Sequence, residues 1–124
     1  MKVRIENISD FNNLDKECVV LVASEDTNIG GYLIFCVTID GKHLDNKVKN
    51  VFWFPDKKVK AGDYIVLFSK AGADREKQLK KGGKAYHFFW GNDSSVWDNN
   101  QKAAVLLHAD EWKTQLIHLH SKKS

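Results

Sequence analysis

Three histidines near the end of the chain come closest to the spacing of a metal site. His118 and His120 are separated by one residue, so on a strand both imidazoles would share one face and could bind zinc or copper. His108 could add a third ligand. However, Ile117 and Leu119 alternate with the pair and would take the core face, which leaves the histidines in solvent. We therefore expect no metal and no cofactor, and keep a metal-binding enzyme as an alternative.

The two cysteines are candidate nucleophiles. A catalytic thiol needs a neighbouring base and an electropositive, partly exposed pocket. Cys18 precedes the run Val-Val-Leu-Val and Cys36 follows Leu-Ile-Phe, so both sequences favour inert packing in an apolar core. We expect reduced, buried thiols, no catalytic residue and no enzymatic activity. A thiol enzyme stands beside the metal site as the second alternative.

A lysine-rich loop, residues 70–84, could bind anions. Its Lys-Lys-Gly-Gly-Lys run is not a P-loop, because Ala85 follows where Ser or Thr is required. A looser basic loop could still contact a nucleic-acid backbone or an acidic protein surface. Asp74 and Glu76 dilute its charge, which favours a solvated loop. The candidate binding residues carry a positive charge or an aromatic ring: Lys70, Arg75, Lys77, Lys80, Lys81, Lys84 and Trp90.

The composition is that of one globular domain. The chain has 124 residues, 43% of them hydrophobic and 28% charged, and a formal net charge of +3. This balance permits nucleic-acid binding but does not favour it, and Arg4 and Arg75 are the only arginines. We expect a single domain over residues 1–120, followed by a frayed tail at 121–124.

The chain shows no targeting or membrane-spanning segment. Residues 1–7 contain no apolar stretch of the signal-peptide kind, and no run approaches the roughly 20 apolar residues of a spanning helix. We therefore expect an intracellular, cytoplasmic protein.

The elements that must position these residues are short strands. Pro55 ends one apolar run, and residues 61–63, Ala-Gly-Asp, form a turn before the next. Residues 44–50 are charged and predict a poorly regular edge, and residues 74–81 could form one or two helical turns ending at a Gly-Gly pair. The pattern predicts an antiparallel sandwich or barrel with strands at 3–8, 17–23, 32–39, 51–54, 64–68, 85–90, 103–108 and 114–120.

Several of these runs resemble the lamin-tail family. The resemblance lies in Gly-Tyr-Leu-Ile at 31–34, Phe-Trp-Phe-Pro at 52–55, Val-Lys-Ala-Gly-Asp-Tyr-Ile-Val at 59–66, and Trp-Asp-Asn at 97–99 before Ala-Val-Leu at 104–106. Together they cover roughly residues 17–120.

This resemblance implies an immunoglobulin-like antiparallel β-sandwich of about eight strands. It also implies an adaptor that binds proteins and, in some members, DNA or membranes. No residue of that family is known to us as catalytic.

The excess of aromatic residues suggests where a partner would bind. Residues 51–54, 64–68 and 87–90 are apolar on both faces of their strands, although one face of each should meet water in a two-layer sandwich. Either loops cover that face or it is exposed to a partner. We therefore predict a non-enzymatic interaction module that binds a protein or a second copy of itself through a sheet face or loops. A weak nucleic-acid-binding module is the first alternative.

Overall fold

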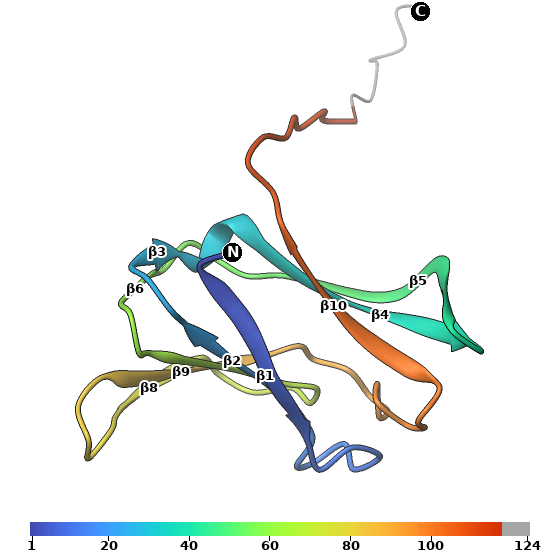
Figure 1. Ribbon diagram of the computed structural model, residues 1–124, viewed down its shortest axis with the longest axis horizontal. Coiled ribbons are helices and arrows are strands. Elements are labelled where there is room, and N and C mark those ends of the chain that lie inside the picture. Colours follow the sequence, from blue (N-terminus) through green and yellow to red (C-terminus); the bar gives the residue numbers. More distant parts are fainter. Residues whose placement is uncertain (118–124) are drawn as a thin grey trace, which may run out of the picture.

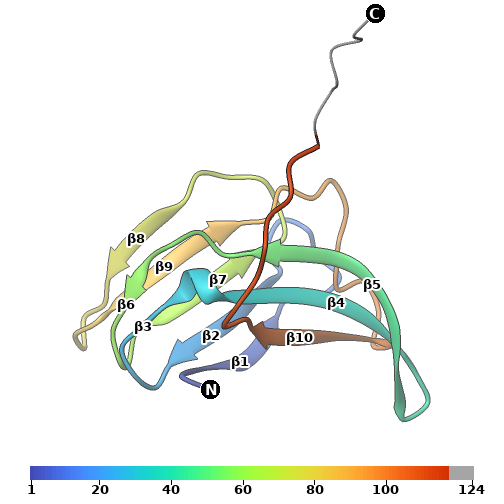
Figure 2. The same ribbon diagram turned by 90° about the horizontal axis from the view of Figure 1, so that it is seen from above.

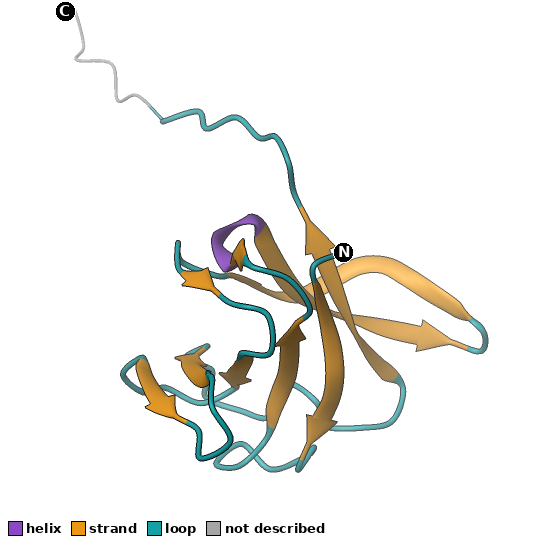
Figure 3. Cartoon of the chain, turned by 60° about the vertical axis from the view of Figure 1, so that its left-hand side comes forward, coloured by secondary structure: helices purple, strands orange, loops and turns teal. Residues whose placement is uncertain are grey.

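The computed structural model describes residues 1–117 (Figure 1). Within them the chain forms ten strands and one short 3-10 helix, drawn in purple in Figure 3. No helix of this part of the chain is long and apolar enough to cross a membrane. The elements are β1 Val3–Ser9, β2 Cys18–Ala23, β3 Thr27–Asn28, η1 Ile29–Gly31, β4 Tyr32–Asp40, β5 His43–Trp53, β6 Lys58–Val59, β7 Tyr64–Phe68, β8 Arg75–Gln78, β9 Lys84–Phe89 and β10 Lys102–His108.

The fold is an all-β sandwich, as the spacing of the apolar runs predicts. The larger sheet has the strand order β1-β2-β7-β9-β8 and the smaller sheet the order β10-β4-β5, while β3 and β6 form a separate short pair. Figure 2 shows the smaller sheet lying over the larger one. The core between them takes alternate residues of each central strand, including Leu21, Ile34, Ile65 and Phe88.

One strand pair departs from the antiparallel pattern. β7 and β9 are parallel, whereas the other pairs are antiparallel. After β7 the chain passes to the outer edge of the sheet, forms β8 there, and returns through a hairpin into β9. Parallel neighbours need such a crossover, and here a strand supplies it instead of a helix.

The prediction of helical turns at 74–81 is wrong. Residues 75–78 form β8, paired antiparallel with β9, because charged side chains can alternate on an edge strand as well as on a helix. Gly82 and Gly83 have φ of 92° and 81° and form the hairpin turn between these strands. Residues 44–50 are also more regular than expected, since β5 runs unbroken from His43 to Trp53 apart from shifts in register.

The chain leaves the sandwich after β10. Residues 109–117 form no strand, so the strand predicted at 114–120 is absent over 114–117. Residues 118–120, with His118 and His120, and the tail at 121–124 lie outside the described residues. The described part of this segment leads away from the body of the molecule (Figures 1 and 3).

Candidate functional site

A buried carboxylate organises one end of the sandwich. Glu17 lies just before β2 and is 0% exposed. Its carboxylate accepts hydrogen bonds from the hydroxyls of Ser69 and Ser95, and from the backbone N–H groups of Val96 (2.8 Å) and Trp97 (3.3 Å). The Asn13 N–H donates a further bond at 3.3 Å. One side chain therefore joins three connections that are far apart in the sequence.

These hydrogen bonds decide the charge of Glu17. Burial by itself raises the pKa of a carboxyl group, because it disfavours the ionised form. The hydrogen bonds from Ser69, Ser95, Val96 and Trp97 outweigh burial and hold the pKa of Glu17 below its ordinary value. The side chain is thus an ionised acceptor that is fully used in holding loops, which does not suit a general acid.

Neither cysteine lies in a nucleophile's environment. Cys18 and Cys36 are free thiols that are both buried. Burial raises the pKa of both, and the charges of Asp10 and Glu17 add to the effect at Cys18. A raised pKa disfavours the reactive thiolate at neutral pH.

Of the three histidines of the alternative metal site, only His108 lies within the described residues. The His108 ring stacks on Tyr32 with centroids 4.4 Å apart, and its Nε2 lies 3.6 Å from an oxygen of Asp110. Within residues 1–117, no group of three or more His, Cys, Asp or Glu side chains is placed to hold a metal ion.

The predicted basic residues do not gather into one surface. Arg75 and Lys77 alternate with Glu76 and Gln78 along β8, so the two cations share the outer face of the larger sheet. Lys84 instead points to the inner side, with its Nζ 2.9 Å from a carboxylate oxygen of Glu76. Lys80 and Lys81 are exposed near the hairpin turn, and Lys70 is half-buried.

The side chain of Trp90 packs toward the smaller sheet. It is half-buried against the core, and its indole N–H donates to the Val51 carbonyl of the smaller sheet at 3.0 Å. Its ring also meets Phe52, with centroids 6.0 Å apart. This tryptophan joins the two layers.

The outer face of the larger sheet nevertheless combines aromatic rings with positive charge. Phe68 and Phe89 are neighbours in register and stack with centroids 5.1 Å apart. The guanidinium of Arg75 lies 5.6 Å from the Phe89 ring, and Lys70 Nζ lies 6.0 Å from the Phe68 ring. Arg75 also donates to Nδ1 of His87, whose pKa is lowered by burial and by the charges of Arg75 and Lys77.

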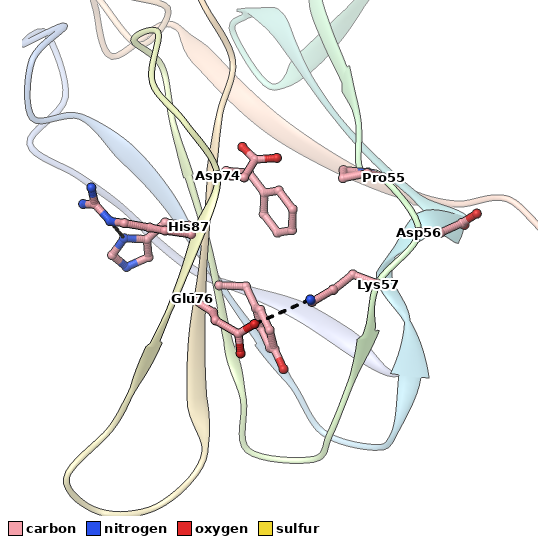
Figure 4. A pocket seen from close by; sticks show the side chains of 9 residues that line it. Pro55, Asp56, Lys57, Asp74, Glu76 and His87 are labelled. Atoms are coloured by element: carbon pink, nitrogen blue, oxygen red, sulfur yellow. Dashed lines mark hydrogen bonds and ion pairs between the residues drawn. The ribbon is translucent and has the colours of Figure 1, made fainter.

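A cleft of about 240 Å³ opens on the other side of β8, between it and the connection from β5 to β6 (Figure 4). In Figure 4 Lys57 and Glu76 point toward one another across it, while His87 points away. The hydrogen bond from Lys84, and the charges of Lys84 and Lys57, lower the pKa of Glu76. Its carboxylate is therefore an ionised partner of two lysines, and it does not suit a proton donor at neutral pH.

The outer face of the smaller sheet is apolar and partly exposed. Six apolar side chains form two rows across its three strands, because Leu33 pairs with Leu107 and Trp53, and Phe35 pairs with Val105 and Val51. Their chain neighbours in β4, Tyr32 and Ile34, are 0% exposed in the core, so these six point outward. We call Leu33, Phe35, Val51, Trp53, Val105 and Leu107 the apolar face.

The apolar face is open to solvent at three of its members. Val51 is 53% exposed, Trp53 49% and Leu107 44%. None of the six members is charged, and Val48 adds a further exposed apolar side chain on β5. A contiguous apolar surface of this kind typically marks an interaction site.

The segment after β10 touches this face at one point. Trp112 packs edge-on against Trp53 with ring centroids 5.2 Å apart, yet it remains 53% exposed. Beyond it, Leu116 and Ile117 are 69% and 93% exposed. Apolar residues therefore lie uncovered both on the sheet and on the segment that leaves it.

Sequence reasoning located this site only in part. The run at 51–54 indicated a strand with two apolar faces, which Val51 and Trp53 bear out. Leu33, Phe35 and Leu107 were not singled out, because strand register alone brings them beside Val51 and Trp53. Glu17 was missed as well, and the only signal was an acidic residue directly before an apolar run.

No protein-family model matches the chain, and no curated protein matches it.

Proposed function

We propose that the chain is a non-enzymatic protein-interaction module of the lamin-tail kind, with an immunoglobulin-like fold, and that it docks its partner on the apolar face. The observation that carries this proposal is the pair of apolar rows on β10, β4 and β5, in which Val51, Trp53 and Leu107 remain exposed. The lamin-tail assignment is supported by the motifs at 31–34, 52–55 and 97–99 and by the all-β sandwich that contains them.

The chemistry of the apolar face favours a protein partner. The face is formed by side chains of adjacent strands and carries no charge, so it offers shape and apolar area in place of directed polar contacts. A small molecule would require an enclosed pocket with a few convergent polar groups. Trp53, at one corner of the face, is the residue type that most often dominates binding energy at protein interfaces.

A non-catalytic role is supported by the surroundings of two carboxylates and two thiols. The Glu17 carboxylate is occupied by five hydrogen bonds, Glu76 pairs with two lysines, and burial raises the pKa of both thiols. Each of these four groups therefore has a structural explanation.

Site-specific photocrosslinking tests the proposal. A photoreactive residue would replace Val51 or Leu107 on the apolar face, or Asn7 on the exposed edge strand β1 as the control. We expect covalent products from the first two positions in cell extract and none from Asn7. Equal labelling at all three positions, or no product at any, would contradict docking on this face.

A second candidate, weak binding of single-stranded nucleic acid, is favoured by one observation. β8 separates its charges, with Arg75 and Lys77 on the outer face, where Arg75 lies 5.6 Å from the Phe89 ring, and Glu76 on the inner side. Basic and aromatic side chains on one sheet face suit phosphates and bases. Titration with an oligonucleotide at two salt concentrations tests it: binding that weakens steeply with salt supports this function, and no binding at low salt removes it.

A further inference from the structure

The proposed docking face and the C-terminal segment are both apolar and exposed. The apolar face lacks a cover, while Trp112, Leu116 and Ile117 of residues 112–117 are apolar and exposed. The edge-on contact of Trp112 with Trp53 fixes where this segment meets the sheet. Apolar residues that cover the face could come from the same chain or from another molecule.

The segment does not cover the face of its own chain. The loop that follows β10 leads away from the sandwich (Figure 3), and Ile117 is 93% exposed. To return to its own strands the chain would have to reverse direction, yet residues 112–117 contain no Gly, Pro, Asn or Asp.

The area of this sheet face decides whether the face alone could hold a dimer together. The outer face of this sheet, three strands about 4.8 Å apart and seven residues long, measures roughly 14 by 23 Å, or roughly 300 Å², and the two apolar rows occupy only part of it. Two such faces in contact would bury roughly 600 Å², which is below the roughly 1,000 Å² expected of a stable interface. The face alone is therefore too small for a stable dimer, and an apolar segment from each chain would enlarge the interface.

The reach of the segment matches this task. From residue 112 to residue 117 an extended chain spans about 17 Å, enough to cross the three strands of a neighbouring sheet. Trp112 and Leu116 are four residues apart and share one side of such a chain, while Ile117 lies on the other. A segment held between two sheets would bury both sides.

We propose that the partner of the apolar face is a second copy of this chain, and that residues 113–117 of each copy, which follow the contact of Trp112 with Trp53 of its own chain, lie across the apolar face of the other. The interface is isologous, since the same face and segment act on both sides of a twofold axis. This inference rests on the proposed function, because it names the partner of the same face.

The first test is the mass of the purified full-length protein in solution, measured by light scattering from micromolar to near-millimolar concentration. We expect a dimer that dissociates on dilution. Leu116→Asp/Ile117→Asp should raise the dissociation constant of the dimer by at least about thirtyfold, which is the effect of losing an interface hot spot. The matched control, Asn99→Asp/Asn100→Asp, adds the same charge at exposed polar positions outside the proposed interface and should leave the dimer intact.

The second test shows whether the C-terminal segment lies on the apolar face of its own chain or on that of the second copy. Oxidised Leu107→Cys/Leu116→Cys protein should give a product of twice the chain mass, with the single variants as controls. An internal disulfide within one chain would show that the segment covers its own face and would overturn the inference. A monomer at all concentrations would overturn it as well.

These outcomes are separable from failure of the proposed function. If the protein is monomeric but photocrosslinks from Val51 and Leu107 capture a different protein, the docking face stands and the second copy does not. If the protein is monomeric and no crosslink forms, both proposals fail.

Discussion

The Glu17 cluster and the apolar face are opposite cases of how a small sandwich treats its side chains. At Glu17 a charge is taken out of water, and hydrogen bonds from Ser69, Ser95, Val96 and Trp97 compensate it. On the apolar face, side chains that would gain from burial are left half in water. The first region is complete within one chain, and the second is not.

The difference separates architecture from function. A buried charge survives only if its surroundings are fixed, so the Glu17 cluster must be formed whenever the protein is folded. An exposed Val51 or Trp53 contributes little to the fold, and its position is explained by what binds there. Substitutions in the two regions should therefore change different measurements.

The largest effect is expected at the cluster. Glu17→Ala leaves the buried N–H groups of Val96 and Trp97 without acceptors, and we expect the free energy of unfolding to fall by about 3–4 kcal/mol in urea denaturation. The matched control, Glu25→Ala, removes an exposed carboxylate and should change stability by less than about 0.5 kcal/mol. Similar losses in the two variants would remove the distinction drawn for Glu17.

The next effect is the pH dependence of stability. Because the folded pKa of Glu17 is lowered, the unfolded chain binds this proton more readily than the folded one. The stabilisation is fully present above the unfolded pKa of about 4.3 and is lost as pH falls through the lower folded value. Urea midpoints measured against pH should fall less steeply in acid for Glu17→Gln than for the wild type, and parallel curves would contradict this origin.

On the apolar face we expect a small effect on stability and a large effect on self-association. Val51→Lys places a charge at a position that is 53% exposed, so stability should change by less than about 1 kcal/mol. Self-association measured by light scattering should nevertheless be lost, because the charge would be desolvated at the interface. Asn7→Lys adds the same charge on β1 and should alter neither property. A Val51→Lys protein that still dimerises would place the interface elsewhere.

The smallest effect on stability is expected on the opposite face. Lys77→Glu on the exposed strand β8 should change the unfolding free energy by less than about 0.5 kcal/mol. If this face binds nucleic acid, the variant should lower the salt dependence of binding by about one unit of slope. Lys60→Glu, on the connection between β6 and β7, is the control, and equal losses in both variants would indicate a general effect of net charge.

The sequence predicts the parts of this molecule that depend on local pattern. Continuous apolar runs locate β2, β4, β7, β9 and β10. Charge alternation on β8 was ambiguous, because an exposed edge strand and a helical turn tolerate the same residues. The parallel pairing of β7 with β9 has no local signal, since it follows from the path of the chain around the edge of the sheet.

The candidate site shows the same limit. The run at 51–54 indicates an apolar outer face, but the rows that join it to Leu33, Phe35 and Leu107 depend on register. Glu17 reads locally as the polar end of a strand, and four of its five hydrogen-bond donors lie 52 to 80 residues away along the chain.

That separation in sequence has a kinetic consequence. The Glu17 hydrogen bonds to Ser69, Val96 and Trp97 close loops of 52, 79 and 80 residues, so they form only after most of the chain has come together. Loss of the carboxylate should then accelerate unfolding while leaving the refolding rate nearly unchanged. The amide protons of Val96 and Trp97 should exchange with solvent only when the whole sandwich opens, which makes them reporters of its lifetime.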